Sequence, residues 1–218
     1  MNHYTIALFD LDGTLSKSGE GILYCVKKIF AETGRTLPDE KKLGTFIGPP
    51  MYDSLRGCGF SHEEAEDGVT IYKRNYVEKG IFMQQLYDGM LPLLKELKNS
   101  GVRLSVATTK YMPFAERIAQ MLGLAPYFDF VAGATAGSER RTKAKVIRYA
   151  LNHLGTDSSD RIVMIGDTKF DAEGAAKENV DFIGCLYGYG TKEEMQVYQP
   201  SAKFVSHPLE LLPLITSE

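Results

Sequence analysis

The residues with the clearest chemical potential are acids that follow short apolar segments. Asp10 and Asp12 open the string Asp-Leu-Asp-Gly-Thr-Leu at positions 10–15, directly after the first apolar run. Asp167 and Asp171 follow a later run of the same kind. Clustered carboxylates repel one another unless a cation lies among them, and hard oxygen ligands suit Mg²⁺. These acids therefore indicate a magnesium site, provided that the fold brings them together.

Hydroxyl and lysine side chains occur at two further places where one predicted element ends or begins. Thr108, Thr109 and Lys110 follow another apolar run, and Lys143 stands at the start of a helical pattern. Such groups can hold the phosphate oxygens over which charge spreads in phosphoryl transfer. A free carboxylate oxygen can attack phosphorus to give an aspartyl-phosphate. An acid two residues later can protonate the leaving oxygen and then take a proton from water.

The spacing of apolar residues predicts the elements that must position these side chains. Short buried strands are expected at 4–9, 102–107, 128–131, 161–165 and 181–185, and amphipathic helices at 89–99, 113–122, 143–153 and 170–178. Strands that alternate with helices of this length predict an α/β fold, a Rossmann-like doubly wound parallel sheet with helices on both faces. Ligands in such sheets bind beyond the carboxyl ends of the strands, which is where the acids, hydroxyls and lysines stand.

The segment 16–87 has a different character. Four helical patterns, at 21–33, 39–46, 50–56 and 61–79, are separated by glycines and prolines, and no strand is evident. This predicts a small all-helical cap domain at 16–87, inserted into a catalytic α/β core made of 1–15 and 88–218.

Composition restricts the partners. The chain has 218 residues and a net charge of −3, so it carries no overall charge that favours nucleic acid or anionic membranes. Its three cysteines form no CxxC pair, and no apolar run approaches the roughly 18 residues of a membrane span. We expect a cytoplasmic protein, monomeric or homodimeric, whose partner is a small phosphorylated metabolite.

The order Asp10 and Asp12, then Thr108, Lys143 and Asp167 resembles the haloacid dehalogenase superfamily of aspartate-nucleophile phosphohydrolases. The resemblance covers essentially the whole chain, with a helical cap after the first motif. It is greatest to the phosphoglycolate phosphatase and bacterial 5′-nucleotidase-like group, through the stretches 18–22, 46–50 and 186–190.

This resemblance implies a catalytic role for four residues. Asp10 would be the nucleophile and Asp12 the general acid and base. Thr108 would be the hydroxyl that binds phosphate, and Lys143 the stabilising cation. Thr142 and Lys143 followed by Val146 and Ile147 match the family spacing, but Lys145 remains an alternative.

The resemblance also implies the ligand contacts. Mg²⁺ would be held by Asp10, the backbone carbonyl of Asp12 and Asp167, with Asp171 nearby or bound through water. Phosphate contacts are expected from Gly13, Thr109 and Lys110.

Two residues separate the alternatives within the superfamily. Dehalogenases lack an acid at the position of Asp12, because a halide leaves without a proton. A β-phosphoglucomutase-like enzyme would carry an arginine where this chain has Met51. A non-catalytic phosphate-binding protein would be expected to have lost Asp10 or Asp12. A phosphatase acting on phosphoglycolate or a nucleoside 5′-monophosphate is therefore favoured, with sugar phosphates and pyrophosphate still open.

Overall fold

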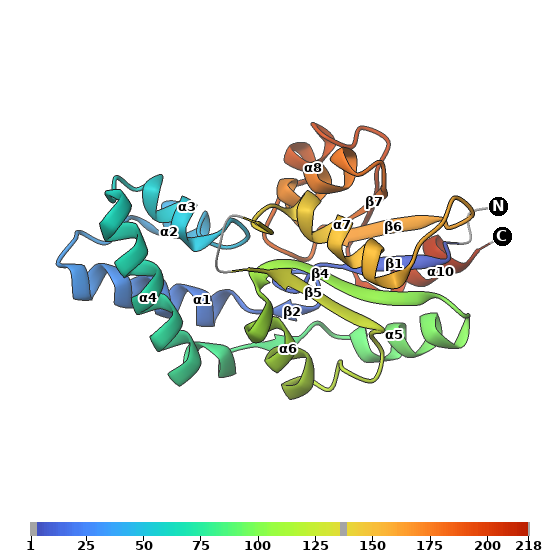
Figure 1. The fold of residues 1–218 in the computed structure, drawn as a ribbon, viewed down its shortest axis with the longest axis horizontal. Helices are drawn as coiled ribbons and strands as arrows, with labels where there is room; N and C mark the ends of the chain where they lie inside the picture. Colours follow the sequence, from blue (N-terminus) through green and yellow to red (C-terminus); the bar gives the residue numbers. More distant parts are fainter. Residues whose placement is uncertain (1–3, 136–138, 218) are drawn as a thin grey trace. The chain divides into compact units, whose positions relative to one another are not determined.

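The computed structural model describes residues 4–135 and 139–217 and divides the chain into two compact units (Figure 1). The first, called here the core unit, consists of Met1–Ser16 and Leu86–Glu218. The second, the helical unit, is Lys17–Gln85. The chain passes between them through the short strands β2 (Ser16–Lys17) and β3 (Gln85–Leu86), which pair with each other.

The core unit is built on a six-stranded parallel sheet with the strand order β5-β4-β1-β6-β7-β8. Its strands are β1 (Ile6–Phe9), β4 (Arg103–Tyr111), β5 (Phe130–Ala134), β6 (Ile162–Gly166), β7 (Asp181–Cys185) and β8 (Lys203–Val205). The five predicted strands are confirmed. The edge strand β8 was not predicted, because three residues are too few to show a hydrophobic pattern.

Strand β4 is longer than the sequence pattern indicates. It continues past Ala107 to Tyr111, so that Thr108, Thr109 and Lys110 lie inside the strand and not after it. The pairing with β5 changes register between Ala107 and Tyr111. Beyond this shift Tyr111 of β4 pairs with Ala134 of β5, a continuation of the strand that apolar patterning alone could not reveal.

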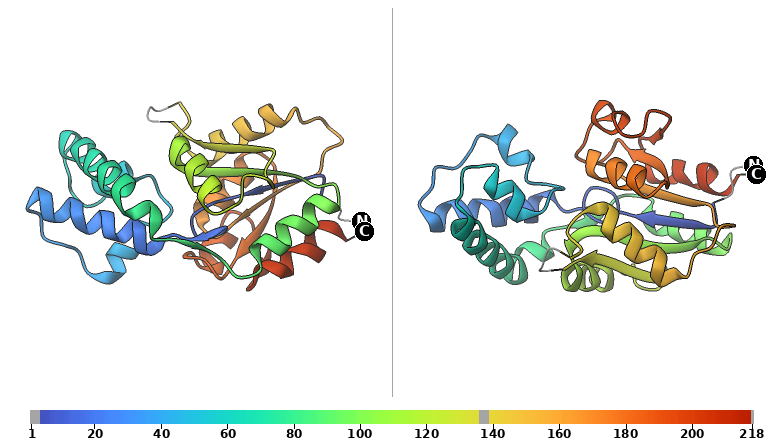
Figure 2. Two further views of the ribbon diagram at one scale, coloured as in Figure 1. Left: turned by 90° about the horizontal axis from the view of Figure 1, so that it is seen from below. Right: turned by 45° about the horizontal axis from the view of Figure 1, so that its top comes forward.

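Helices cover both sides of the sheet. They are α5 (Met90–Asn99), α6 (Met112–Met121), α7 (Lys143–Leu154), α8 (Lys169–Lys177), α9 (Lys192–Gln196), η2 (Pro208–Glu210) and α10 (Leu211–Thr216). Helix α7 lies on one side, and α5 and α10 lie together on the other (Figure 2). Buried residues of β1, such as Ile6 and Leu8, pack in one cluster with Val146, Ile147 and Ala172 from α7 and α8. The predicted α/β fold class is confirmed.

The helical unit contains α1 (Gly19–Thr33), α2 (Glu40–Gly44), α3 (Met51–Arg56), α4 (His62–Glu78) and η1 (Gly80–Phe82). Its centre holds Phe30, whose ring meets Phe46 and Phe60 edge to face at centroid distances of 6.1 and 5.4 Å. Such aromatic pairs stabilise a small core beyond the area that they bury. Helix α4 begins with a capping box in which Ser61 and Glu64 satisfy each other's backbone N–H groups.

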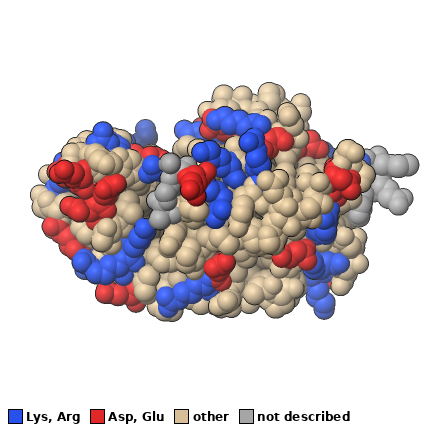
Figure 3. All heavy atoms as spheres, in the orientation of Figure 1, with Lys and Arg blue, Asp and Glu red and all other residues tan. Residues whose placement is uncertain are grey.

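Positive and negative side chains are mixed on the face of the molecule drawn in Figure 3. On the face drawn in Figure 3, Lys and Arg side chains and Asp and Glu side chains occur on both units. None of the helices in the described ranges is long and apolar enough to cross a membrane.

Candidate active site

The site lies where the strand order reverses, at the carboxyl end of the central strand β1. Strand β1 has β4 on one side and β6 on the other. The chain leaves β1 at Asp10, whose backbone N–H still donates to the carbonyl of Ile165 in β6 at 2.9 Å. This switch point is the usual ligand position in an open parallel sheet.

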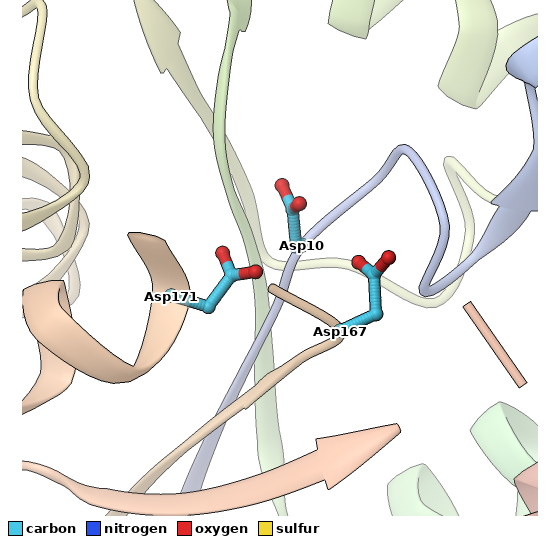
Figure 4. Close-up of side chains that lie close together, drawn as sticks. All are labelled: Asp10, Asp167 and Asp171. Atoms are coloured by element: carbon cyan, nitrogen blue, oxygen red, sulfur yellow. The ribbon is translucent and has the colours of Figure 1, made fainter. Parts of the chain in front are cut away.

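Three buried carboxylates meet at this point (Figure 4). Asp10, Asp167 and Asp171 each offer an oxygen within 4.8 Å of the others, and they are 5%, 0% and 0% exposed. Asp10 follows β1, Asp167 follows β6, and Asp171 lies in the first turn of α8. Asp167 thus precedes the helix, whereas Asp171 belongs to it.

Lys143 places its ammonium group among these carboxylates. Its Nζ lies 2.7 Å from Oδ1 of Asp10 and 2.7 Å from Oδ1 of Asp171, and it donates to the carbonyl of Ala107 at 2.9 Å. Lys143 opens α7 and is buried, whereas Lys145, two residues on, is exposed. The structure therefore brings Lys143 to the site and not Lys145.

Asp171 uses both of its carboxylate oxygens within the protein. Oδ1 faces Lys143, and Oδ2 accepts from the backbone N–H of Thr168 at 2.9 Å and from its hydroxyl at 2.7 Å. Thr168 stands where α8 begins. Thr168 thus anchors the carboxylate of Asp171 at the start of the helix.

Asp167 is held by the loop after β1 and by the loop after β7, of which the second was not predicted as part of the site. Its Oδ1 accepts from the hydroxyl of Thr14 at 3.0 Å, and its Oδ2 accepts from the backbone N–H of Tyr189 at 2.8 Å. A Cβ atom at Gly188 or Gly190 would overlap with Asp167. The glycine-rich stretch 186–190 was visible in the sequence, but nothing there indicated which side chain it encloses.

Burial gives these groups unusual proton affinities. Burial raises the pKa of Asp10 to about 6; Lys143 opposes this rise, and the charge of Asp171 adds to it. The pKa of Asp167 is raised well above its ordinary value by burial and by the charges of Asp171 and Asp10. Burial would lower the pKa of Lys143, but the facing carboxylates Asp10 and Asp171 outweigh it and raise that pKa.

The charge balance of the site fits a divalent cation. Three buried carboxylates and the one ammonium of Lys143 would sum to −2 if all were ionised. The raised pKa values of Asp10 and Asp167 express this uncompensated charge. An oxygen-only donor set of this charge suits Mg²⁺ better than a softer metal.

A second, separate ion pair lies beside this cluster. Nζ of Lys110 is 2.6 Å from Oδ2 of Asp12, and the two side chains are 6% and 12% exposed. Lys110, from which a phosphate contact is expected, thus places its ammonium group against Asp12, the acid two residues after Asp10.

The remaining predicted contacts lie around the loop 10–16 and the end of β4. Thr108 is 1% exposed, and its Oγ1 accepts from the backbone N–H of Lys110 at 3.2 Å. Thr109 lies next to it and is half-buried. The N–H of Gly13, expected to bind phosphate, donates to the carbonyl of Ser16 at 2.8 Å. Gly13 has a φ of +85°, and a Cβ there would overlap with Asp167.

Comparison with known proteins gives relatives along almost the whole chain. At the level of sequence, residues 7–185 match the family described as haloacid dehalogenase-like hydrolase. A 5′-nucleotidase of Pseudomonas aeruginosa is 34% identical over 91% of this chain and 90% of its own length. A solved structure, described as a predicted phosphatase from Clostridium acetobutylicum, has a TM-score of 0.91 and 38% identity and covers 98% of both chains.

One relative bears a different name. The tyrosine-protein kinase PtkA of Mycobacterium tuberculosis is 37% identical over 85% of this chain. This chain spans 63% of the length of that protein. The family match and the full-length similarity to the other two proteins agree with the fold and with the residues gathered at the end of β1. The chain belongs to the haloacid dehalogenase-like hydrolase family.

Proposed function

We propose that this protein is a Mg²⁺-dependent phosphatase that hydrolyses small phosphate monoesters through an aspartyl-phosphate on Asp10. The observation that carries the proposal is the position of Asp10, at the end of β1 with Lys143 at 2.7 Å and two further buried carboxylates within 4.8 Å. The similarity to the 5′-nucleotidase of Pseudomonas aeruginosa and to the predicted phosphatase from Clostridium acetobutylicum supports it.

The metal ion would be held by Asp10, the backbone carbonyl of Asp12 and Asp167. Asp171 is the less suitable direct ligand, because its Oδ2 already accepts two hydrogen bonds from Thr168 and its Oδ1 faces the ammonium group of Lys143. In Asp167, by contrast, Oδ1 and Oδ2 each accept a hydrogen bond from a neutral donor, which leaves each oxygen a second lone pair for the metal ion. When bound, Mg²⁺ supplies positive charge that neutralises the phosphoryl oxygens and orients the phosphorus toward the nucleophile.

The protein's own groups carry out the two chemical steps. In the first step an oxygen of Asp10 forms a bond to phosphorus while the P–O ester bond breaks. The electron pair of the ester bond goes to the leaving oxygen, which takes a proton from Asp12. Water then attacks phosphorus and gives a proton to Asp12, and the electron pair of the acyl-phosphate bond returns to Asp10. Thr108 and Lys143 hold the oxygens that do not react.

The helical unit would select the substrate, because the core residues would contact only the phosphate group, which all candidate substrates share. Met51, the first residue of α3, stands where a phosphomutase would need an arginine. Hydrolysis is therefore favoured over transfer to a second sugar phosphate.

Transfer to protein tyrosine is a second candidate, favoured by the 37% identity to the kinase PtkA. The two proposals differ in donor and acceptor. A hydrolase transfers phosphate from a monoester to water, whereas a kinase transfers it from a nucleoside triphosphate to a tyrosine hydroxyl.

A panel of phosphorylated compounds tests the proposal. The purified protein is incubated with phosphoglycolate, nucleoside 5′-monophosphates, sugar phosphates and pyrophosphate, with Mg²⁺ or with EDTA, and released phosphate is measured. We expect release only with Mg²⁺ and a loss of at least about 10³-fold in Asp10→Asn. Full activity in that variant would exclude the covalent mechanism. Labelling of a tyrosine peptide from ATP, faster than any hydrolysis, would favour the kinase.

A further inference from the structure

Lys110 and Asp12 form an ion pair that joins two strand ends far apart in the chain. Lys110 lies near the end of β4, and Asp12 stands 98 positions earlier, in the loop after β1. Their atoms Nζ and Oδ2 are 2.6 Å apart, with side chains 6% and 12% exposed. A charge-assisted hydrogen bond with so little access to water has a defined geometry, unlike an exposed pair. The carboxylate of Asp12 therefore has a set orientation.

The second oxygen of Asp12 is in a different situation. Oδ1 is buried and has no hydrogen-bond partner within residues 4–135 and 139–217. A buried carboxylate oxygen without a partner is costly, and native proteins keep such atoms chiefly where a ligand or water completes them. In this carboxylate, Oδ1 is thus the atom available to an incoming group.

We infer that Lys110 is a positioning residue for proton transfer: it holds Oδ2 of Asp12 so that Oδ1 exchanges the proton with the leaving group and with water. The inference rests on the proposed phosphatase function and adds the atom and the residue that directs it. In the first step the proton on Oδ1 moves to the leaving oxygen as the P–O bond breaks. In the second step Oδ1 takes a proton from the attacking water, which restores the starting state.

This role makes a prediction that phosphate binding by Lys110 does not. An alkyl phosphate releases a strongly basic alkoxide, which needs a proton as the bond breaks, whereas 4-nitrophenolate leaves without one. Loss of proton transfer therefore slows the first step for an alkyl ester and spares an aryl ester. Loss of a phosphate contact slows both esters alike, because both carry the same phosphoryl group.

The experiment compares Lys110→Met with wild type on 4-nitrophenyl phosphate and on the alkyl ester that wild type hydrolyses best. The ratio kcat/KM is measured, because it reports only the steps up to formation of the phosphoenzyme. We expect kcat/KM to fall about 10²-fold or more for the alkyl ester and less than about tenfold for the aryl ester. Equal losses on both esters would overturn the inference.

Three further variants separate positioning from general damage. Lys110→Arg keeps the charge and should retain most of the alkyl-ester activity. In an Asp12→Asn background, Lys110→Met should cause no further loss on the alkyl ester beyond about twofold, because the two residues act as one unit. The matched control is Lys98→Met, which breaks a Lys–Asp pair of the same 2.6 Å length, to Asp129, at a site where both side chains are about a third exposed. It should leave both esters unchanged.

Inhibition by inorganic phosphate gives an independent readout. If Lys110 acts through Asp12, Lys110→Met should bind phosphate within about threefold of wild type, and tenfold weaker binding would assign Lys110 to phosphate and overturn the inference. A wild-type protein that hydrolyses neither ester, or full activity in Asp10→Asn, would overturn the proposed function and this inference with it. Activity in wild type with equal losses in Lys110→Met would overturn the inference alone.

Discussion

Lys143 and Asp171 form an ion pair that is almost completely sealed from water, with Nζ and Oδ1 2.7 Å apart and side chains 3% and 0% exposed. The pair joins the first turn of α7 to the first turn of α8, and the same Nζ also lies 2.7 Å from Oδ1 of Asp10. A buried ammonium group needs such partners to remain charged. Asp171 therefore helps to hold Lys143 where it faces Asp10.

The first prediction concerns which of two lysines, Lys143 or Lys145, takes part in catalysis. Lys143→Met should lower kcat/KM by about 10²–10³-fold, because the cation that faces the phosphoryl oxygens is lost. It should also destabilise the fold by about 3–5 kcal/mol, because carboxylates are left buried without a partner. Steady-state kinetics and denaturant unfolding measure the two effects. Lys145→Met, on the exposed face of α7, should change kcat/KM by less than about twofold, and the reverse order would make Lys145 the catalytic residue.

The second prediction separates the two acids near α8. Asp167→Asn should weaken Mg²⁺ binding by more than about 100-fold, since this carboxylate is proposed as a direct ligand. Asp171→Asn should weaken it by only about tenfold, as expected for a residue that acts through its neighbours. Calorimetric titration with Mg²⁺ measures both affinities without substrate. Equal losses would make Asp171 a direct ligand as well.

The third prediction concerns the glycine-rich loop around Asp167. Gly188→Ala should destabilise the protein by about 1–3 kcal/mol and weaken Mg²⁺ binding, because the added methyl group would overlap with the side chain of Asp167. The control is Gly44→Ala in α2, where a Cβ meets nothing within 4 Å. That change should alter the free energy of unfolding by less than about 1 kcal/mol. Metal affinity equal to wild type in Gly188→Ala would contradict this role of the loop.

The fourth prediction is a pH dependence of the metal-free protein. Burial raises the pKa of Asp10 from 3.8 to about 6 on folding, so the folded state holds this proton more tightly than the unfolded state. The contribution of Asp10 to stability is therefore fully present below pH 3.8 and is lost as the pH rises through about 6.

Denaturant unfolding at several pH values tests this dependence. Between pH 4 and pH 7, wild type without metal should lose about 2–3 kcal/mol more stability than Asp10→Asn, which cannot titrate. Parallel pH profiles for the two proteins would refute the prediction. Mg²⁺ added at pH 7.5 should stabilise wild type, since it binds the ionised carboxylate.

Local patterning in the sequence was sufficient for the elements and for the kinds of side chain at the strand ends. The periods of apolar residues predicted the strands around Phe9 and Ile165 and the helix that begins at Lys143, because burial on one or both faces of an element leaves a short-range signal. The order of Asp10, Thr108, Lys143 and Asp167 along the chain indicated the family, which the comparison confirms. The individual roles of these residues stay predictions.

Only the tertiary structure decided how these side chains pair. The sequence favoured Lys143 by its spacing but left Lys145 as an alternative, and the packing of α7 buries Lys143 and exposes Lys145. Likewise, Lys110 pairs with Asp12 because the ends of the neighbouring strands β1 and β4 meet. The interaction between two charges is strong only when they lie within a few ångströms of each other. For two groups 98 positions apart in the chain, that distance depends on the order and register of the strands, which a local sequence pattern does not determine.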